Sequence, residues 1–109
     1  MTTVDVYIQK AAATIGGPGY YLSLHNGLFG PATTALRALI RAYEDGTLTG
    51  PWHTSYIEAT VPGTVIRSVL AAVDPQDLGS RGDHDRERFA AFCTAIEDGA
   101  DYSVKAIEV

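Results

Sequence analysis

The spacing of apolar and polar residues changes along the chain between a period of two and a period of about 3.6. Residues 3–10 and 53–61 alternate clearly and residues 20–25 alternate weakly, while residues 102–109 are expected to form the last strand. Alternation is typical of a strand with one buried face. In the first strand it places Val4, Val6 and Ile8 on one face and Asp5, Tyr7 and Gln9 on the other.

Two segments carry apolar residues at helical spacing. The first opens at Gly30-Pro31, with proline in its first turn, and ends at Asp45-Gly46 with a glycine C-cap. Its apolar stripe is Leu36, Leu39, Ile40 and Tyr43. The second segment ends at Gly99, and its stripe is Phe89, Phe92, Cys93 and Ile96. Both stripes are followed by Glu-Asp-Gly and then a strand, which predicts two strand–helix–strand halves.

The segment 62–73 fits two structures. Pro62 and Gly63 suit the central positions of a type II turn, and the β-branched residues after them suit a central strand. In that strand interpretation Gly63 takes a positive φ. The same stretch also fits a helix that begins near Pro62, with the stripe Ile66, Val69, Leu70 and Val73. We favour the strand and keep the helix as the alternative.

These elements predict a single α+β domain over residues 1–109. With a strand at 64–73 the order is βαββαβ, a ferredoxin-like sandwich whose antiparallel sheet carries both helices on one face. Residues 20–29 are then an insertion after the first strand. With 64–73 helical, the order becomes ββαβααβ.

One face of such a sheet is left without helices. The first strand would present Asp5, Tyr7 and Gln9 there, and the second Thr54, Tyr56, Glu58 and Trp52. A strand at 64–73 would add Val65, Arg67, Val69 and Val73. Because soluble monomers seldom expose so large a patch of valines and aromatics, we expect a second copy or another protein to cover it.

Composition and charge narrow the function. The chain has 109 residues, which is enough to bury a core, with 8 basic and 13 acidic residues and a net charge of −5. This charge weighs against nucleic-acid binding and suits a protein partner with a basic surface. We expect no membrane segment and no signal peptide. The one cysteine, Cys93, cannot form an internal disulfide, so a cytoplasmic location is expected.

Acidic pairs occupy the last turns of the two helices. Carboxylates at Glu44-Asp45 and Glu97-Asp98 oppose the helix dipole, so helix energetics did not select them. Solubility or turn formation explains them structurally, and contact with a basic partner explains them functionally. Antiparallel helices would place the two pairs at opposite ends of the sheet. The predicted partner-binding residues are Glu44, Asp45, Glu97, Asp98, Tyr7, Trp52, Tyr56 and Val69.

Residues suited to catalysis or metal binding are few and scattered. The histidines and Cys93 lack the close spacing of a zinc site, so no metal or cofactor is expected. Cys93 falls on a helical stripe, where a buried thiol is expected. The alternative to a binding protein is a small dimeric ligand-binding protein or enzyme with a pocket near residues 20–29. Its lining would be Tyr20, Tyr21, His25 and His53.

The absence of a convergent acid–base set favours a non-enzymatic function. Immunity proteins and phage-encoded viral inhibitors share this size, charge and lack of catalytic motif, although no motif links the chain to a family. We therefore expect a small acidic protein that binds and inhibits or sequesters a macromolecular partner. A homodimer is a further expectation.

Overall fold

The computed structural model describes residues 3–11, 19–26, 30–53, 55–78 and 83–108. In chain order its strands are β1 (Val4–Lys10), β2 (Tyr21–His25), β3 (Tyr56–Pro62) and β4 (Asp101–Glu108). The helices are α1 (Pro31–Glu44), α2 (Gly63–Ala71) and α3 (Asp83–Ala95), with a 3-10 turn η1 (Pro75–Asp77) between α2 and α3. The element order is therefore ββαβααβ, the alternative order considered above.

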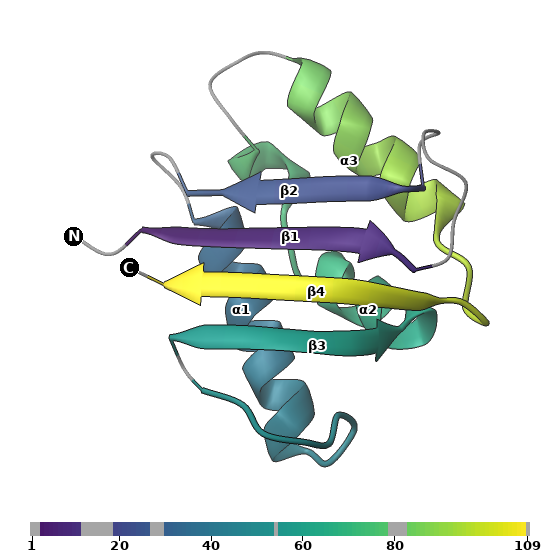
Figure 1. The fold of residues 1–109 in the computed structure, drawn as a ribbon. Helices are drawn as coiled ribbons and strands as arrows, with labels where there is room; N and C mark the ends of the chain where they lie inside the picture. The colour runs from purple at the N-terminus through teal and green to yellow at the C-terminus, as the bar shows by residue number, and fades with distance from the viewer. Residues whose placement is uncertain (1–2, 12–18, 27–29, 54, 79–82, 109) are drawn as a thin grey trace.

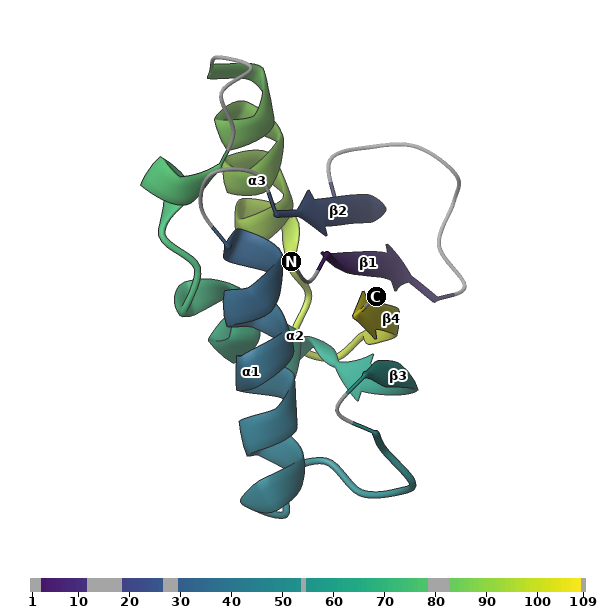
Figure 2. The ribbon, with the colours of Figure 1, turned by 90° about the vertical axis from the view of Figure 1, so that its left-hand side faces the viewer.

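The four strands form one antiparallel sheet in the order β2-β1-β4-β3. The start of β1 and the end of β4 lie side by side, with Val4 opposite Glu108 (Figure 1). All three helices lie on the same side of the sheet, and α1 crosses behind the strands (Figures 1 and 2). The fold is thus a two-layer α+β structure with one sheet face covered by helices.

Alternation in the strands decides which side chains enter the core. Val4, Val6 and Ile8 of β1 point toward the helices, as expected, and they meet alternating residues from the other strands. These are Leu22, Leu24, Ile57, Val61, Tyr102, Val104 and Ala106. Leu36 and Leu39 of α1 and Phe92 of α3 cover them. The buried side chains form one hydrophobic cluster between the two layers.

Local signals explain both ends of α1. Pro31 occupies its first turn, and the Asn26 side chain accepts hydrogen bonds from the backbone N–H groups of Ala32 and Thr33 at 3.1 and 3.2 Å. Asn26 thereby satisfies donors that a helix start leaves unpaired. At the other end Gly46 has a φ of 80°, which glycine adopts without the strain of a Cβ. Both predicted boundaries of this helix are confirmed.

The favoured strand at 64–73 is wrong. Pro62 is the N-cap residue, with φ −62° and ψ 150°, and α2 begins at Gly63. The helical stripe Val65, Ile66, Val69, Leu70 and Val73 is buried. The preference of each β-branched residue for a strand amounts to only a fraction of a kilocalorie per mole. The free energy gained by burying a continuous helical stripe is larger. The ferredoxin-like order βαββαβ therefore does not occur, and the segment 20–29 contributes an edge strand instead of an insertion.

The Glu-Asp-Gly repeat does not mark two equivalent halves. After α1 the chain runs through a long loop before β3, whereas after α3 it turns at once into β4. Gly46 has a positive φ, but Gly99 does not. Instead the Ala100 N–H donates to the Glu97 carbonyl at 3.1 Å, closing a short turn. The first sequence ends α1, but α3 already ends at Ala95, so the second sequence lies in the turn that follows α3. The predicted end of this helix at Gly99 is therefore wrong.

Candidate functional site

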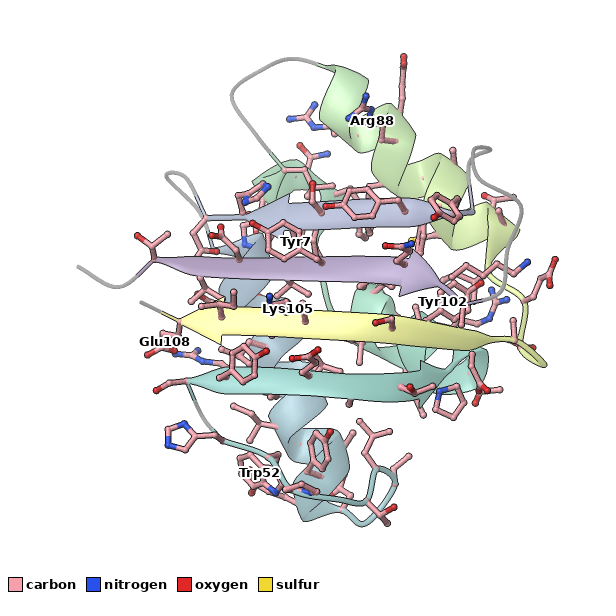
Figure 3. All side chains as sticks on the ribbon, viewed as in Figure 1. Tyr7, Trp52, Arg88, Tyr102, Lys105 and Glu108 are labelled. Carbon is pink, nitrogen blue, oxygen red and sulfur yellow. The ribbon has the colours of Figure 1, made fainter. Side chains whose placement is uncertain are left out.

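The sheet face opposite the helices, here called the uncovered face, is built from the outward residues of all four strands. The register aligns them in rows from β2 to β3. The rows are His25, Asp5, Ile107 and Tyr56; Ser23, Tyr7, Lys105 and Glu58; and Tyr21, Gln9, Ser103 and Thr60. Figure 3 shows Tyr7 and Lys105 in front of the sheet. Twelve side chains are thus aligned on this face, three from each strand.

Polar contacts order one side of the uncovered face. His25 Nδ1 lies 2.7 Å from Asp5 Oδ1, and the Tyr7 ring meets the His25 ring edge-on at a centroid distance of 5.8 Å. Farther along the strands, Gln9 Nε2 donates to the Tyr20 hydroxyl at 2.7 Å. These contacts hold two aromatic rings and an imidazole in defined positions, which lowers the entropy cost of binding a partner there.

At the β3 side, the Tyr56 hydroxyl donates a hydrogen bond to Glu58 Oε2. That hydrogen bond is the main cause that raises the pKa of the Tyr56 phenol above its ordinary value, with desolvation and the Glu58 charge as smaller causes. Lys105 lies in register between Tyr7 and Glu58. Lys105 therefore has a tyrosine on one side and a carboxylate on the other.

Exposed aromatic area is concentrated on the same face. Tyr21 is 48% exposed and Tyr56 is 41% exposed, and both are outward residues of the edge strands. The third exposed large apolar residue among those described is Trp52, at 39%. Its ring stacks on Tyr43 of α1 at 5.6 Å, and Figure 3 shows it past the β3 edge, outside the aligned rows of the uncovered face. The expectation that Trp52 joins the open face is therefore wrong.

Val69 also fails as a contact residue on the uncovered face. It lies on α2 and is 2% exposed, packed in the core together with Val65 and Val73. Arg67 stands on the exposed side of the same helix instead of on a strand. The hydrophobic component expected from these valines is absent, because their segment is a helix whose apolar stripe faces the sheet. Thr54 lies outside the described residues.

The acidic pairs differ in their surroundings. Glu44 and Asp45 are exposed at the end of α1. Glu97 Oε2 lies 2.8 Å from Lys10 Nζ, and Asp98 Oδ1 lies 3.0 Å from Arg67 Nε. The second pair thus has a structural explanation in ion pairs that connect the α3–β4 turn to β1 and α2.

The four residues proposed to line a ligand pocket do not converge. Tyr20 precedes β2, and Tyr21 and His25 lie on β2 at one edge of the sheet. His53 forms a bridge with Tyr56 beside β3, which is the opposite edge. Two strands separate the groups, so they form no common pocket.

A shallow pocket of about 330 Å³ lies elsewhere, between α2, η1 and α3. Leu70, Val73, Phe89 and Ile96 line it, together with Arg67 and Cys93. Burial raises the pKa of the half-buried Cys93 thiol, and the nearby Arg67 charge partly offsets that rise. A thiol that favours its protonated form is a poor nucleophile near neutral pH.

Within the described ranges, no three residues among histidine, cysteine, aspartate and glutamate are grouped closely enough to hold a metal ion. The helices assigned there are also too short or too polar to cross a membrane.

Lys105, Ser23 and Ser103 are outward residues that the sequence analysis did not single out. The alternation of Tyr102, Val104 and Ala106 with polar residues was available as a signal for the last strand. It shows which side chains face outward, but not which strand lies beside them. No protein-family model matches the chain, and no curated protein or solved structure is similar enough to count as a match.

Proposed function

We propose that this chain is a small acidic interaction protein that binds a protein partner through the uncovered face and thereby inhibits or sequesters that partner. One observation carries the proposal: helices cover a single side of the sheet, and the other side presents an ordered array containing Tyr7, Tyr21 and Tyr56. Tyrosine with serine and other small polar residues is the composition of many protein-binding surfaces, because it gives rigid contact area with adaptable hydrogen bonding.

The charge of the face supports a protein partner over a nucleic acid. The face holds the carboxylates of Asp5 and Glu58 against one ammonium group, that of Lys105. A phosphate-binding surface needs several clustered cations. The net charge of −5 lies mostly outside the face, where it would attract a partner with a basic surface and speed the encounter.

The Asp5–His25 pair supports an enzymatic function less than the tyrosine array supports protein binding. A carboxylate that orients an imidazole is part of a general-base arrangement, but a nucleophile within hydrogen-bond reach is also needed. Among the described residues, no hydroxyl or thiol makes a hydrogen bond to His25. The pair also lies on an exposed strand surface and not in a pocket that would exclude water.

The test compares two matched double variants in capture from a lysate of the native host. Tyr7→Ser/Tyr56→Ser removes two of the three tyrosine rings from the face, and Arg37→Ser/Arg41→Ser changes two exposed residues of α1 on the other side. A captured protein is identified by mass spectrometry, and its affinity is measured with purified components. We expect the tyrosine variant to bind at least about tenfold more weakly and the arginine variant to bind within about twofold of wild type.

Equal affinity of all three proteins would overturn the proposal, and so would capture of a metabolite alone. The activity of the captured protein, measured with and without the chain, tests inhibition separately. A second copy is one protein that fits the surface. Sedimentation that shows a dimer in wild type and a monomer in the tyrosine variant would identify it as the partner.

A further inference from the structure

The two edges of the sheet differ in how many backbone N–H donors their strands direct outward without a described partner: two at β3 and three at β2. At the β3 edge, Pro62 has no N–H, and the Tyr56 N–H donates to the His53 carbonyl at 3.2 Å. The Gly63 N–H donates to Ala100, so the odd-numbered residues of β3 bond β4. This leaves Glu58 and Thr60 as the outward N–H donors of β3. Proline and a returning loop are devices that protect sheet edges from strand addition.

Among the residues that the structure describes, neither device protects the β2 edge. The Lys10 N–H donates to the Tyr20 carbonyl at 2.8 Å, and antiparallel strands alternate their bonding pairs. The N–H and C=O groups of Tyr21, Ser23 and His25 therefore point away from β1. No backbone group of the described residues bonds them from outside. None of the three is proline or lysine, and β2 contains no bulge.

Helix α3 continues the helix layer past this edge. It contacts β2, and both views show it on the helix side of the sheet and extending beyond β2 (Figures 1 and 2). An added strand beside β2 would therefore have α3 behind it, as the existing strands have helices behind them. Its alternate side chains would continue the rows that contain Leu22 and Leu24 on the covered side.

We propose that the β2 edge docks an extended segment of a partner protein as a fifth strand. The segment would pair with the outward groups of Tyr21, Ser23 and His25, each of which offers one donor and one acceptor. It would alternate, with apolar side chains toward α3 and polar or aromatic side chains beside Tyr21 and His25. This inference is independent of the proposed function, because it uses the backbone of an edge and not the side chains of the face.

A lone extended segment fits this edge better than a second copy. Pairing of β2 with β2 of another copy follows a two-fold axis perpendicular to the sheet, which keeps the helices of both copies on one side. Each copy would then bring its own α3 to the side where the first α3 already extends past the edge (Figure 2). A segment without a helix meets no such conflict.

The experiment blocks the outward donor of Ser23 with proline. Proline is tolerated at an edge position whose N–H faces solvent, so Ser23→Pro keeps the pairing of β2 with β1. Ser23→Ala controls for the side chain, and Thr60→Pro places the same change at the other edge. The probe is a phage-displayed library of random peptides about ten residues long, selected on wild-type protein.

We expect the selected peptides to bind Ser23→Ala and Thr60→Pro within about twofold of wild type and Ser23→Pro at least about tenfold more weakly. A second measurement does not depend on the folding of any variant: peptide binding to wild type should slow amide hydrogen exchange at Tyr21, Ser23 and His25. Recovery of no binding peptide would overturn the proposal. Peptides unaffected by Ser23→Pro with unchanged exchange at β2 would do the same, and so would a wild-type dimer that this variant abolishes.

Discussion

Gly63 lies so close to the backbone of Glu97 that a Cβ on Gly63 would be 1.9 Å from the Glu97 carbonyl oxygen. The contact brings the first turn of α2 against the chain that leads from α3 to β4, and the Gly63 N–H donates to the Ala100 carbonyl at 2.8 Å. Gly63 does not have a positive φ. The position requires glycine because two backbones meet there, and not because of its own conformation.

Gly63→Ala is therefore expected to lower the free energy of unfolding by about 3 kcal/mol, because the backbone at Glu97 must move to admit a methyl group. Gly99→Ala is the matched control, since a Cβ there would meet nothing within 4 Å. Urea denaturation of the two variants and wild type measures the difference. Equal stability of the two variants would contradict the close approach.

Val69 gives a direct test of the helix at 63–71. Because its side chain is 2% exposed, Val69→Ala should lower the free energy of unfolding by about 2 kcal/mol. Ser68→Ala, on the exposed side of the same helix, should change it by less than about 0.5 kcal/mol. If Val69→Ala were as stable as Ser68→Ala, the helical stripe would not face the core.

The two acidic pairs should respond differently to charge reversal. Glu97→Lys/Asp98→Lys breaks the ion pairs with Lys10 and Arg67 and replaces attraction by repulsion, so we expect a loss of about 1 kcal/mol. Glu44 and Asp45 form no ion pair with any residue that the structure describes. Their reversal adds cations at a helix C-terminus, so stability should stay the same or rise slightly. Thermal unfolding at low and high salt distinguishes the cases, because salt should shrink the loss in the first variant. If both double variants responded equally, the two ion pairs would not contribute to the free energy of unfolding.

Local pattern predicted much of this fold because several elements contain their own boundary and face signals. Alternation placed Val4, Val6 and Ile8 inward, and Pro31 with Gly46 bounded α1. The prediction of a strand after Pro62 was wrong because β-branched residues at helical spacing fit both a strand and a helix. The choice depends on the burial of the helical stripe against distant parts of the chain, which no window around the segment contains. The close approach of Gly63 to Glu97 is another such distant contact.

The candidate site shows the same limit. Period two placed Tyr7, Tyr56 and Glu58 on the face opposite the core, and the register confirms that placement. It could not place Lys105 between Tyr7 and Glu58, because that neighbour relation follows from the strand order β2-β1-β4-β3. The β2 edge likewise could not be predicted, because the weakly alternating segment 20–25 does not show whether its strand lies at the edge or in the middle of the sheet.

The Cys93 thiol should show a pH profile set by its burial and by Arg67. Because burial raises its pKa, alkylation by iodoacetamide should be slow near pH 7, with a midpoint above the ordinary thiol value of about 8.5. The Arg67 charge lowers this pKa, so Arg67→Gln should move the midpoint to higher pH while Arg67→Lys leaves it nearly unchanged. Easier access to the pocket would raise the plateau rate without moving the midpoint. A midpoint that moves down in Arg67→Gln would contradict the assignment.

The raised pKa of Cys93 also makes the free energy of unfolding depend on pH. When the folded-state pKa of a thiol lies above its unfolded value, the unfolded chain loses the proton first as pH rises. The thiol's contribution to the free energy of unfolding is therefore fully present below the pKa of the unfolded state. It is lost as pH rises through the pKa of the folded state. Wild type should lose more stability than Cys93→Ala between pH about 7 and about 10, because the alanine variant lacks this proton. Other groups titrate in both proteins, so the difference between their urea midpoints reports the titration of Cys93 alone. If that difference stays constant with pH, burial does not raise the pKa of Cys93.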